Sequence, residues 1–389
     1  MSTLYLHIGT PKTGTTAIQY FLLNNRELLK EKGYYYPVMK EKFERISIRR
    51  NAHFLIDYKC NKEMDRDVQQ QKIQSCYNEL FLALDENKNV ILSDEAIWHA
   101  CKKIKNFWGN LLSRTKEKGH NLKVIVYLRR QDEFIQSYWK CKVLANETRS
   151  FEEYVKSKKY AFCPLNYYTH LSNISKIVGK DNILVRIYEK EQYKGRAHTI
   201  VSDFMDAIGL ELTSEYEQTN DEKNISLDYI CTEIKRRFNA MPEFEGKNDF
   251  LRMFMRTVTE QNKEKVMYQC TSLFTPKEQD RFLKKYAAEN SKVAKEFLKR
   301  EDGILFYAPI VYNDKSKEFS KEEYIAVCGK IILEMGTKNI LLEQERKMVV
   351  KEFNDYKTKS ESVFRKIVSA LTPEKIKQTE IWCKLRERN

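Results

Sequence analysis

The fold is decided near the N-terminus by the stretch Thr3-Leu-Tyr-Leu-His-Ile-Gly-Thr-Pro-Lys-Thr-Gly-Thr-Thr16. Residues 3–8 are a mostly apolar run suited to a buried strand, and residues 9–16 are rich in Gly, Pro, Lys and Thr. Apolar residues at helical spacing follow over residues 17–29, and Gly33 ends this pattern. The stretch therefore predicts a strand, a loop and a helix in immediate succession.

Three later apolar runs predict further interior strands at Val90–Leu92, Val124–Leu128 and Ile183–Ile187. Helical patterns lie between and after them, at Gln69–Leu84, Phe134–Leu144 and Ala197–Ile208. Strands that alternate with helices indicate a mainly parallel sheet covered on both faces. The sequence therefore predicts an α/β, three-layer, P-loop-like fold with helices flanking a central sheet.

This α/β core is expected to end near residue 210, because no convincing strand pattern follows it. Amphipathic helical patterns occupy residues 225–300, at Leu227–Phe238 and Gln279–Phe297. Residues 318–389 are rich in Lys and Glu and helical in period, with a weak break at Leu371-Thr-Pro373. The C-terminal part of the chain is thus predicted to be helical.

The loop between the first strand and helix has the composition of an anion-binding site. Gly9 and Gly14 would let the main chain approach an anion, Lys12 adds a positive charge, and Thr15 and Thr16 offer hydroxyl groups. The start of the following helix adds backbone N–H donors and the positive end of a dipole. An ordinary turn would explain the glycines and the proline, but it would not require the lysine and the threonines.

A Walker A loop is not present, because there the lysine directly follows the last glycine and precedes Ser or Thr. In this chain Lys12 precedes Gly14 by two positions.

A second candidate anchor follows the strand at Val124–Leu128. Arg129 would lie at the carboxyl edge of the sheet, where open α/β sheets bind ligands. Ser137 comes eight residues later, about two helical turns away, and could face the same point. An arginine fork with a hydroxyl group suits a phosphate dianion. The alternative for Arg129 is an ordinary ion pair at the end of a strand.

The residues from His7 to Thr16 resemble the 5′-phosphosulfate loop of sulfotransferases that use 3′-phosphoadenosine 5′-phosphosulfate (PAPS), whose core is Pro-Lys-(Ser/Thr)-Gly-(Ser/Thr)-(Ser/Thr). The resemblance assigns PAPS binding to Pro11, Lys12, Thr13, Gly14, Thr15 and Thr16. It also implies that Arg129 and Ser137 hold the 3′-phosphate, since the family has an Arg at a strand end and a Ser eight residues later.

The chain departs from the commoner family pattern at Gln131 and Phe134, where Pro and often Arg occur. The Arg-Arg-Gln-Asp form of residues 129–132 is similar to a bacterial branch that resembles carbohydrate sulfotransferases. Weaker similarities continue at residues 184–189, which end in Tyr-Glu, and to about residue 306. The resemblance thus implies a sulfotransferase domain over residues 1–306 (α/β core 1–210, helical acceptor-side or lid region 211–306) and a basic helical extension over 307–389.

Sulfuryl transfer needs positive charge on the leaving phosphate and a base for the acceptor hydroxyl. The first role suits Lys12, which would lie at the bridging oxygen. Two residues compete for the second: Glu95, which follows a strand at the same sheet edge, and His53, whose ordinary pKa is near neutral. The sequence slightly favours Glu95. Asp94 suits a helix cap better than a catalytic role.

These inferences imply a catalyst that transfers the sulfuryl group of PAPS in line to an acceptor hydroxyl and releases adenosine 3′,5′-bisphosphate, with no metal required. The expected acceptor is a saccharide or glycolipid, and a sterol or phenol is an alternative. Two other functions compete: a small-molecule kinase with a degenerate P-loop, and a non-catalytic basic binding protein. We expect no nucleic-acid partner.

The composition sets further limits. Formal net charge is +14, which favours an anionic ligand and allows peripheral contact with an anionic membrane face. Nine cysteines, an odd number without a C-x-x-C pair, suggest reduced thiols. The sequence contains no signal-peptide pattern and no long uncharged apolar run. The prediction is a soluble cytoplasmic protein.

Overall fold

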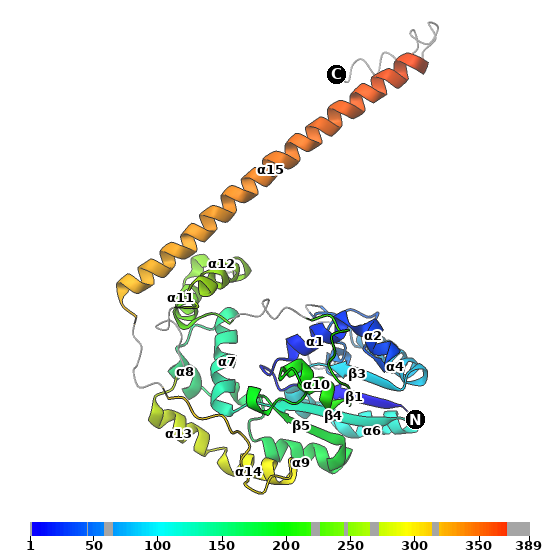
Figure 1. Cartoon of the computed structure of the whole chain (residues 1–389), viewed down its shortest axis with the longest axis vertical. Coiled ribbons are helices and arrows are strands. Elements are labelled where there is room, and N and C mark those ends of the chain that lie inside the picture. The colour runs from blue at the N-terminus through cyan, green and yellow to red at the C-terminus, as the bar shows by residue number, and fades with distance from the viewer. Residues whose placement is uncertain are drawn as a thin grey trace.

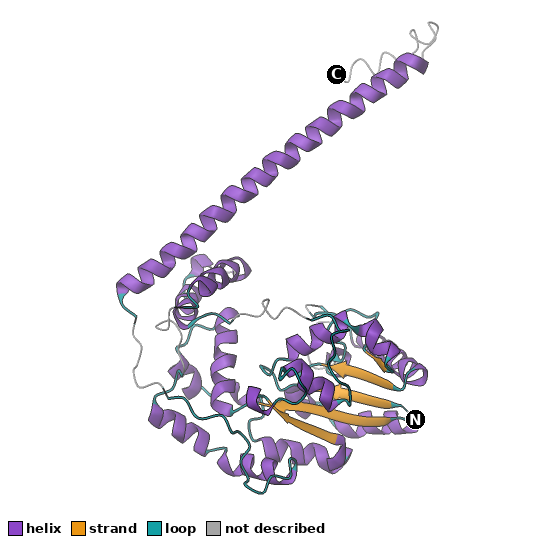
Figure 2. Ribbon diagram, in the orientation of Figure 1, coloured by secondary structure: helices purple, strands orange, loops and turns teal. Residues whose placement is uncertain are grey.

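The computed structural model describes residues 2–44, 46–57, 65–218, 226–244, 248–264, 272–312 and 319–371. Its centre is a five-stranded sheet in which every paired strand is parallel to its neighbour, in the order β2-β3-β1-β4-β5 (Figures 1 and 2). The strands are β1 (Thr3–His7), β2 (Tyr34–Tyr35), β3 (Asn89–Ser93), β4 (Asn121–Leu128) and β5 (Ile183–Ile187). The predicted α/β fold is confirmed.

Helices cover both faces of this sheet because its strands are apolar on both sides. On one face, Tyr5, Ile91 and Ile125 pack with residues of helices α1 (Thr15–Asn24) and α10 (Ile200–Ala207). On the opposite face, alternate residues of the same strands pack in a larger cluster. The helices of that larger cluster include α4 (Arg66–Glu86), α5 (Ile97–Ala100), α6 (Phe107–Glu117), α7 (Gln131–Leu144), α8 (Phe151–Lys156) and α9 (Tyr167–Val178).

Two of the predicted helices are each divided into two. The first becomes α1 and α2 (Arg26–Glu31) because Asn25 departs from helical geometry, and its side chain binds Glu217, donating to its carbonyl and accepting from its N–H. The helix predicted at Gln279–Phe297 becomes α13 (Pro276–Lys284) and α14 (Ala287–Glu296), which meet at the largely buried Tyr286.

The C-terminal helices belong to two different hydrophobic clusters. Residues of α13 and α14 pack into the larger cluster of the α/β core. By contrast, α11 (Tyr229–Asn239) and α12 (Asn248–Gln261) pack against the beginning of α15 (Lys321–Leu371) and form a cluster of their own. The rest of α15 projects away from the body of the molecule (Figure 1). Within the described residues, no helix combines the length and apolar character needed to cross a membrane.

Candidate functional site

Three neighbouring strands end beside one another at the carboxyl edge of the sheet, since β1 lies between β3 and β4. The loop of residues 8–14 follows β1, Glu95 follows β3, and Arg129 follows β4. The carboxyl edge of an open parallel sheet is where such folds bind ligands. The structure therefore brings Lys12, Glu95 and Arg129 to one edge, as the sequence predicted.

The loop after β1 is held to β4 by main-chain hydrogen bonds. The N–H of Ile8 donates to the carbonyl of Ile125 at 3.0 Å, and the N–H of Thr10 donates to that of Tyr127 at 2.9 Å. In return, Tyr127 N–H donates to the carbonyl of Gly9 at 2.7 Å. The first part of the loop thus has a fixed position relative to the strand that carries Arg129.

Three loop residues have positive φ angles: Gly9 at 98°, Lys12 at 68° and Gly14 at 72°. A Cβ atom at position 9 would lie 3.1 Å from the main chain of Glu95, and one at position 14 would lie 3.0 Å from Ile200. Glycine is therefore required at both places. Lys12 is a non-glycine residue in a costly conformation, and such residues gather at functional sites.

The loop threonines differ in what their hydroxyl groups do. Thr13 is fully buried, and its hydroxyl donates to the carbonyl of Thr10 at 2.6 Å, so this group stabilises the loop itself. Thr15 is buried and Thr16 is half-buried at the start of α1. The N-cap residue of α1 is Gly14, which has no side chain to cap the helix, and the first turn contains no acidic residue. The helix therefore presents its N–H groups and the positive end of its dipole to the loop.

Arg129 contacts the loop directly. Its Nη1 donates to the main-chain carbonyl of Lys12 at 3.0 Å, and its guanidinium lies 5.1 Å from the centre of the Tyr188 ring. Its Nε lies 3.2 Å from a carboxylate oxygen of Glu133. Ser137 is half-buried on α7, one turn beyond Glu133 and on the same helix face. Glu133 thus lies between the two residues predicted to hold a phosphate.

Glu95 is partly open, with 25% of its side chain exposed. Its Oε2 accepts a hydrogen bond from Gln19 of α1 at 3.1 Å and lies 3.8 Å from Nε of Arg50. Because Gly9 packs against its main chain, Glu95 adjoins the loop. This carboxylate is therefore fixed, accessible and close to the loop that carries Lys12.

His53 lies in a different environment, buried in the short 3-10 turn His53–Leu55. Its Nδ1 lies 3.1 Å from Asp94 and its Nε2 lies 3.4 Å from Asp57. Burial lowers the pKa of His53, but hydrogen bonds to these two carboxylates outweigh burial and leave the pKa raised. Since both ring nitrogens face carboxylates, His53 has no nitrogen left to take a proton from an acceptor.

Asp94 joins this buried group to the edge of the sheet. It is fully buried and accepts hydrogen bonds from Nε and Nη2 of Arg50, at 3.1 and 2.7 Å, and from the N–H of Ala96. Burial raises the pKa of Asp94, but His53 and Arg50 outweigh this and hold the pKa below its ordinary value. Asp94 is thus a structural carboxylate, and it positions the chain that continues into Glu95.

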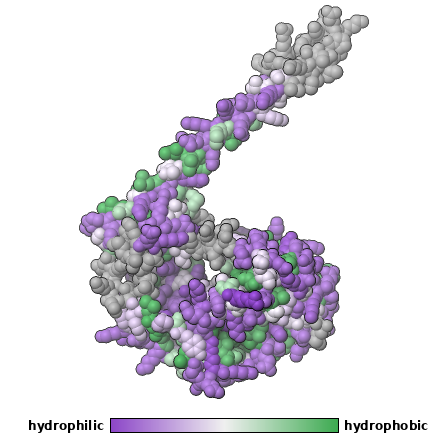
Figure 3. All heavy atoms as spheres, viewed as in Figure 1, coloured by the Kyte–Doolittle hydropathy of each residue, from purple (hydrophilic) through white to green (hydrophobic). Residues whose placement is uncertain are grey.

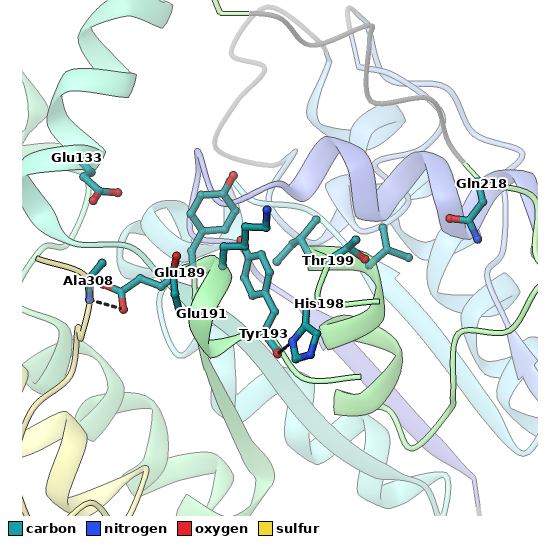
Figure 4. Close-up of a pocket in the computed structure, with 12 residues that line it drawn as sticks. Glu133, Glu189, Glu191, Tyr193, His198, Thr199, Gln218 and Ala308 are labelled. Atoms are coloured by element: carbon teal, nitrogen blue, oxygen red, sulfur yellow. Dashed lines mark hydrogen bonds between the residues drawn. The ribbon is translucent and has the colours of Figure 1, made fainter. Parts of the chain in front are cut away.

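A cavity of about 510 Å³ opens beside the loop and Arg129, and sequence reasoning did not predict it. Figure 4 shows Glu133, Glu189, Tyr193 and His198 around it. Tyr188 also lines it, and the ring of Tyr188 would lie 3.2 Å from a Cβ at Gly14. The Tyr-Glu ending of residues 184–189 is the sequence feature that could have indicated this cavity, because Tyr188 and Glu189 both line it. The cavity therefore runs along the end of β5 to the start of α10, and Tyr188 and Ile200 in its wall lie next to Gly14 of the loop.

A segment from the C-terminal half of the chain closes one side of the cavity. The N–H groups of Tyr307 and Ala308 donate to Glu189, and Arg130 donates to the carbonyls of Ala308 and Pro309. Among the described residues, no group of three or more His, Cys, Asp or Glu side chains could hold a metal ion.

Comparison with known proteins finds similarity to an uncharacterized protein of Archaeoglobus fulgidus, 27% identical over 192 residues. The match covers 48% of this chain and 50% of the relative, so the chain spans about half the length of the curated protein that it matches. No protein-family model matches the chain, and no solved structure matches it.

Proposed function

We propose that the protein is a sulfotransferase that transfers the sulfuryl group of PAPS to an acceptor hydroxyl. The observation that carries this proposal is the hydrogen bond from Arg129 to the carbonyl of Lys12. It joins the two predicted phosphate sites, so a single ligand with phosphates at both ends of a nucleoside could reach them together.

The loop would bind the 5′-phosphosulfate. Lys12 and the N–H groups at the start of α1 would neutralise the charge that develops on the leaving phosphate. Arg129, with Ser137 beyond it on α7, would hold the 3′-phosphate. No metal has a role in this arrangement, because the positive charge comes from Lys12, Arg129 and the helix dipole.

The cavity beside Arg129 would receive the nucleoside. Its volume lies within the range of about 300–1,000 Å³ that is usual for small-molecule sites. The rings of Tyr188 and Tyr193 lie 6.0 Å apart there, and both line the cavity. Aromatic side chains of this kind offer flat apolar surfaces to a purine base.

Glu95 would accept the proton of the acceptor hydroxyl as the oxygen attacks sulfur. The hydrogen bond from Gln19 orients the carboxylate, and partial exposure lets an acceptor approach it. The S–O bond to the phosphate breaks as the new S–O bond forms, and adenosine 3′,5′-bisphosphate leaves. We propose Glu95 rather than His53 for this step because carboxylates occupy both ring nitrogens of His53. The acceptor that we propose is a saccharide.

The first experiment measures ligand-induced thermal stabilisation of the full chain. We expect adenosine 3′,5′-bisphosphate to raise the melting temperature at concentrations where 5′-AMP, and ATP with magnesium, do not. Stabilisation by ATP with magnesium alone would favour a kinase, and stabilisation by an oligonucleotide alone would favour a basic binding protein.

The second experiment follows transfer from ³⁵S-labelled PAPS to a panel of saccharide, glycolipid, phenol and sterol acceptors. Lys12→Ala should abolish transfer while leaving the melting temperature unchanged. A matched control is Lys118→Ala, an exposed lysine that precedes β4 at the opposite edge of the sheet. Full activity in Lys12→Ala would refute the assignment.

A further inference from the structure

The long helix α15 has two parts with different surroundings. In the first part, Val327 and Ile331 are buried against α11 and α12, and Lys330 donates to Asn262 of the segment after α12 at 2.8 Å. From residue 336 to residue 362, every described side chain of α15 is exposed. This second part projects roughly 40 Å beyond the body of the molecule at about 1.5 Å per residue.

The projecting part is unusually apolar for an exposed helix. Figure 3 shows hydrophobic residues along the rod where it leaves the body. Eight large apolar side chains are 47–72% exposed within this part. They are Ile340, Leu341, Leu342, Met348, Val349, Val350, Phe353 and Tyr356. An apolar surface of this extent marks an interaction site, and a long helix generally requires packing for its stability.

Four of these eight residues, Leu342, Val349, Phe353 and Tyr356, recur at the a and d positions of a seven-residue repeat. With Ile332 placed at position a, the a and d positions through Tyr356 hold six apolar residues out of eight. In order, these positions are Ile332, Met335, Asn339, Leu342, Arg346, Val349, Phe353 and Tyr356. Met335 already packs against the cluster of α11 and α12, so the seam of the projecting part begins at Asn339 and holds four apolar residues out of six. Such a repeat, with apolar residues at a and d, is typical of a two-stranded coiled coil. A polar residue at position a, such as Asn339, is a known device that fixes register and the number of strands.

The charges beside this seam select the partner. In a parallel coiled coil, each g residue faces the e residue five positions later in the other helix. Lys338 at g would face Glu343 of a second copy, and Glu352 at g would face its Lys357. In this exposed part, every g–e pair in which both residues are charged joins a basic residue to an acidic one. The helix is therefore complementary to itself when two copies lie parallel and in register.

The same charges disfavour a membrane surface. Between residues 336 and 362 there are six basic and five acidic residues. A helix that binds an anionic membrane has a strongly basic polar face, which this mixture does not provide.

We propose that the protein forms a homodimer through a parallel, in-register coiled coil of the projecting part of α15. Apolar residues at a and d bury one another, and the Lys338–Glu343 and Glu352–Lys357 pairs fix orientation. This interface is independent of the proposed activity, because it lies on a helix that projects away from the candidate site (Figure 1).

Light scattering coupled to size-exclusion chromatography tests the proposal with the full chain. We expect twice the chain mass of 46.4 kDa. Leu342→Glu should produce a monomer with an unchanged melting temperature for the body. The matched control is Ile340→Glu, because Ile340 is exposed on the same helix, at 61% against 49% for Leu342, but lies outside the seam. A wild-type monomer, or equal loss of mass in both variants, would overturn the proposal.

Charge reversal tests the orientation without removing apolar residues. Lys338→Glu should weaken dimerisation at least tenfold, and adding Glu343→Lys should restore it, since the two residues meet only between copies. Tyr356→Cys should form a disulfide between copies under mild oxidation, whereas the wild-type protein should not. Failure of the double variant to recover, or a monomer that sediments with phosphatidylserine vesicles, would contradict the parallel dimer.

Discussion

Arg129 donates a hydrogen bond from Nη1 to the main-chain carbonyl of Lys12, over 3.0 Å. The bond uses only Nη1 of Arg129 and the main chain of Lys12, so Nη2 and the Lys12 ammonium group can still face a ligand. It also fixes the distance between Arg129 and the main chain at Lys12. Among the described residues, only Glu133 forms an ion pair with Arg129. In the proposed site, the charge that meets a ligand phosphate would thus be set by three side chains, those of Arg129, Lys12 and Glu133.

Arg129→Ala should remove discrimination for the 3′-phosphate. We expect the variant to bind adenosine 3′,5′-bisphosphate about as weakly as 5′-AMP, at a cost of about 2–5 kcal/mol relative to wild type. Isothermal titration with both ligands measures this difference. The control is Arg114→Ala, an exposed arginine on α6 that stacks on Tyr77 much as Arg129 stacks on Tyr188. A variant that still prefers the bisphosphate would place the 3′-phosphate elsewhere.

Glu133→Gln should increase affinity for adenosine 3′,5′-bisphosphate. The carboxylate of Glu133 competes with a phosphate for Arg129 and repels it, whereas an amide does neither. We expect a several-fold lower Kd, with the largest gain at low ionic strength because salt screens this repulsion. Titration at two salt concentrations measures the effect. Weaker binding would instead mean that Glu133 orients Arg129 for the ligand.

Glu95→Gln should reduce kcat by roughly 10²–10⁴ with little change in PAPS affinity. The amide oxygen can still accept the hydrogen bond from Gln19, so the side chain keeps its place and loses only its basicity. Initial rates at saturating acceptor, together with a binding measurement, separate the two effects. Undiminished turnover would show that another group takes the proton.

Gly9→Ala should destabilise the protein more than Gly119→Ala. Both glycines have positive φ angles, 98° and 76°, so both substitutions bring backbone strain of about 1–2 kcal/mol. The added methyl group at position 9 meets Glu95 at 3.1 Å, whereas no heavy atom lies within 4 Å at position 119. Crowding of this kind adds about 1–3 kcal/mol. Urea denaturation of both variants checks the difference, and equal losses would contradict the contact with Glu95.

His53→Ala should destabilise the protein more at pH 6 than at pH 9. The pKa of His53 is raised in the folded state, so its contribution is full below the unfolded value of about 6.5 and is lost as pH rises through the folded value. Breaking a buried ion pair costs roughly 3–5 kcal/mol, which sets the scale of the loss at low pH.

Melting temperatures of wild type and His53→Ala across this pH range measure the effect. A difference between them that grows with pH would show that His53 is neutral when folded. Because we place His53 outside the reaction, turnover of the variant should fall only as far as its stability does.

The sequence predicted the main strands and the position of the loop after β1, because the signal for these features is local. β1 and β5 are short apolar runs, and the loop after β1 carries its own composition, so no distant contact is needed to recognise them. By contrast, β2 is a two-residue strand that exists because Tyr34 and Tyr35 pair with Asn89 and Val90. A segment so short has no periodicity to detect.

Features that depend on distant contacts could not be predicted. The break at Asn25 depends on Glu217, and the environment of His53 depends on Asp94, which lies 41 positions away. The sequence favoured Glu95 only slightly over His53, because residue type and position along the chain do not show what surrounds each side chain. Only the folded chain shows one carboxylate partly open and the imidazole enclosed between two others.

The central position of β1 has a consequence for how the chain acquires its site during synthesis. The first strand made needs β3 on one side and β4 on the other, and the latter ends at Leu128. Until β4 is available, Ile8 and Thr10 lack the carbonyls to which their N–H groups donate. A nascent chain shorter than about 130 residues would thus carry every residue of the loop without the main-chain bonds that order it. The loop proposed to bind the ligand would take its final shape only when a strand made much later joins the first one.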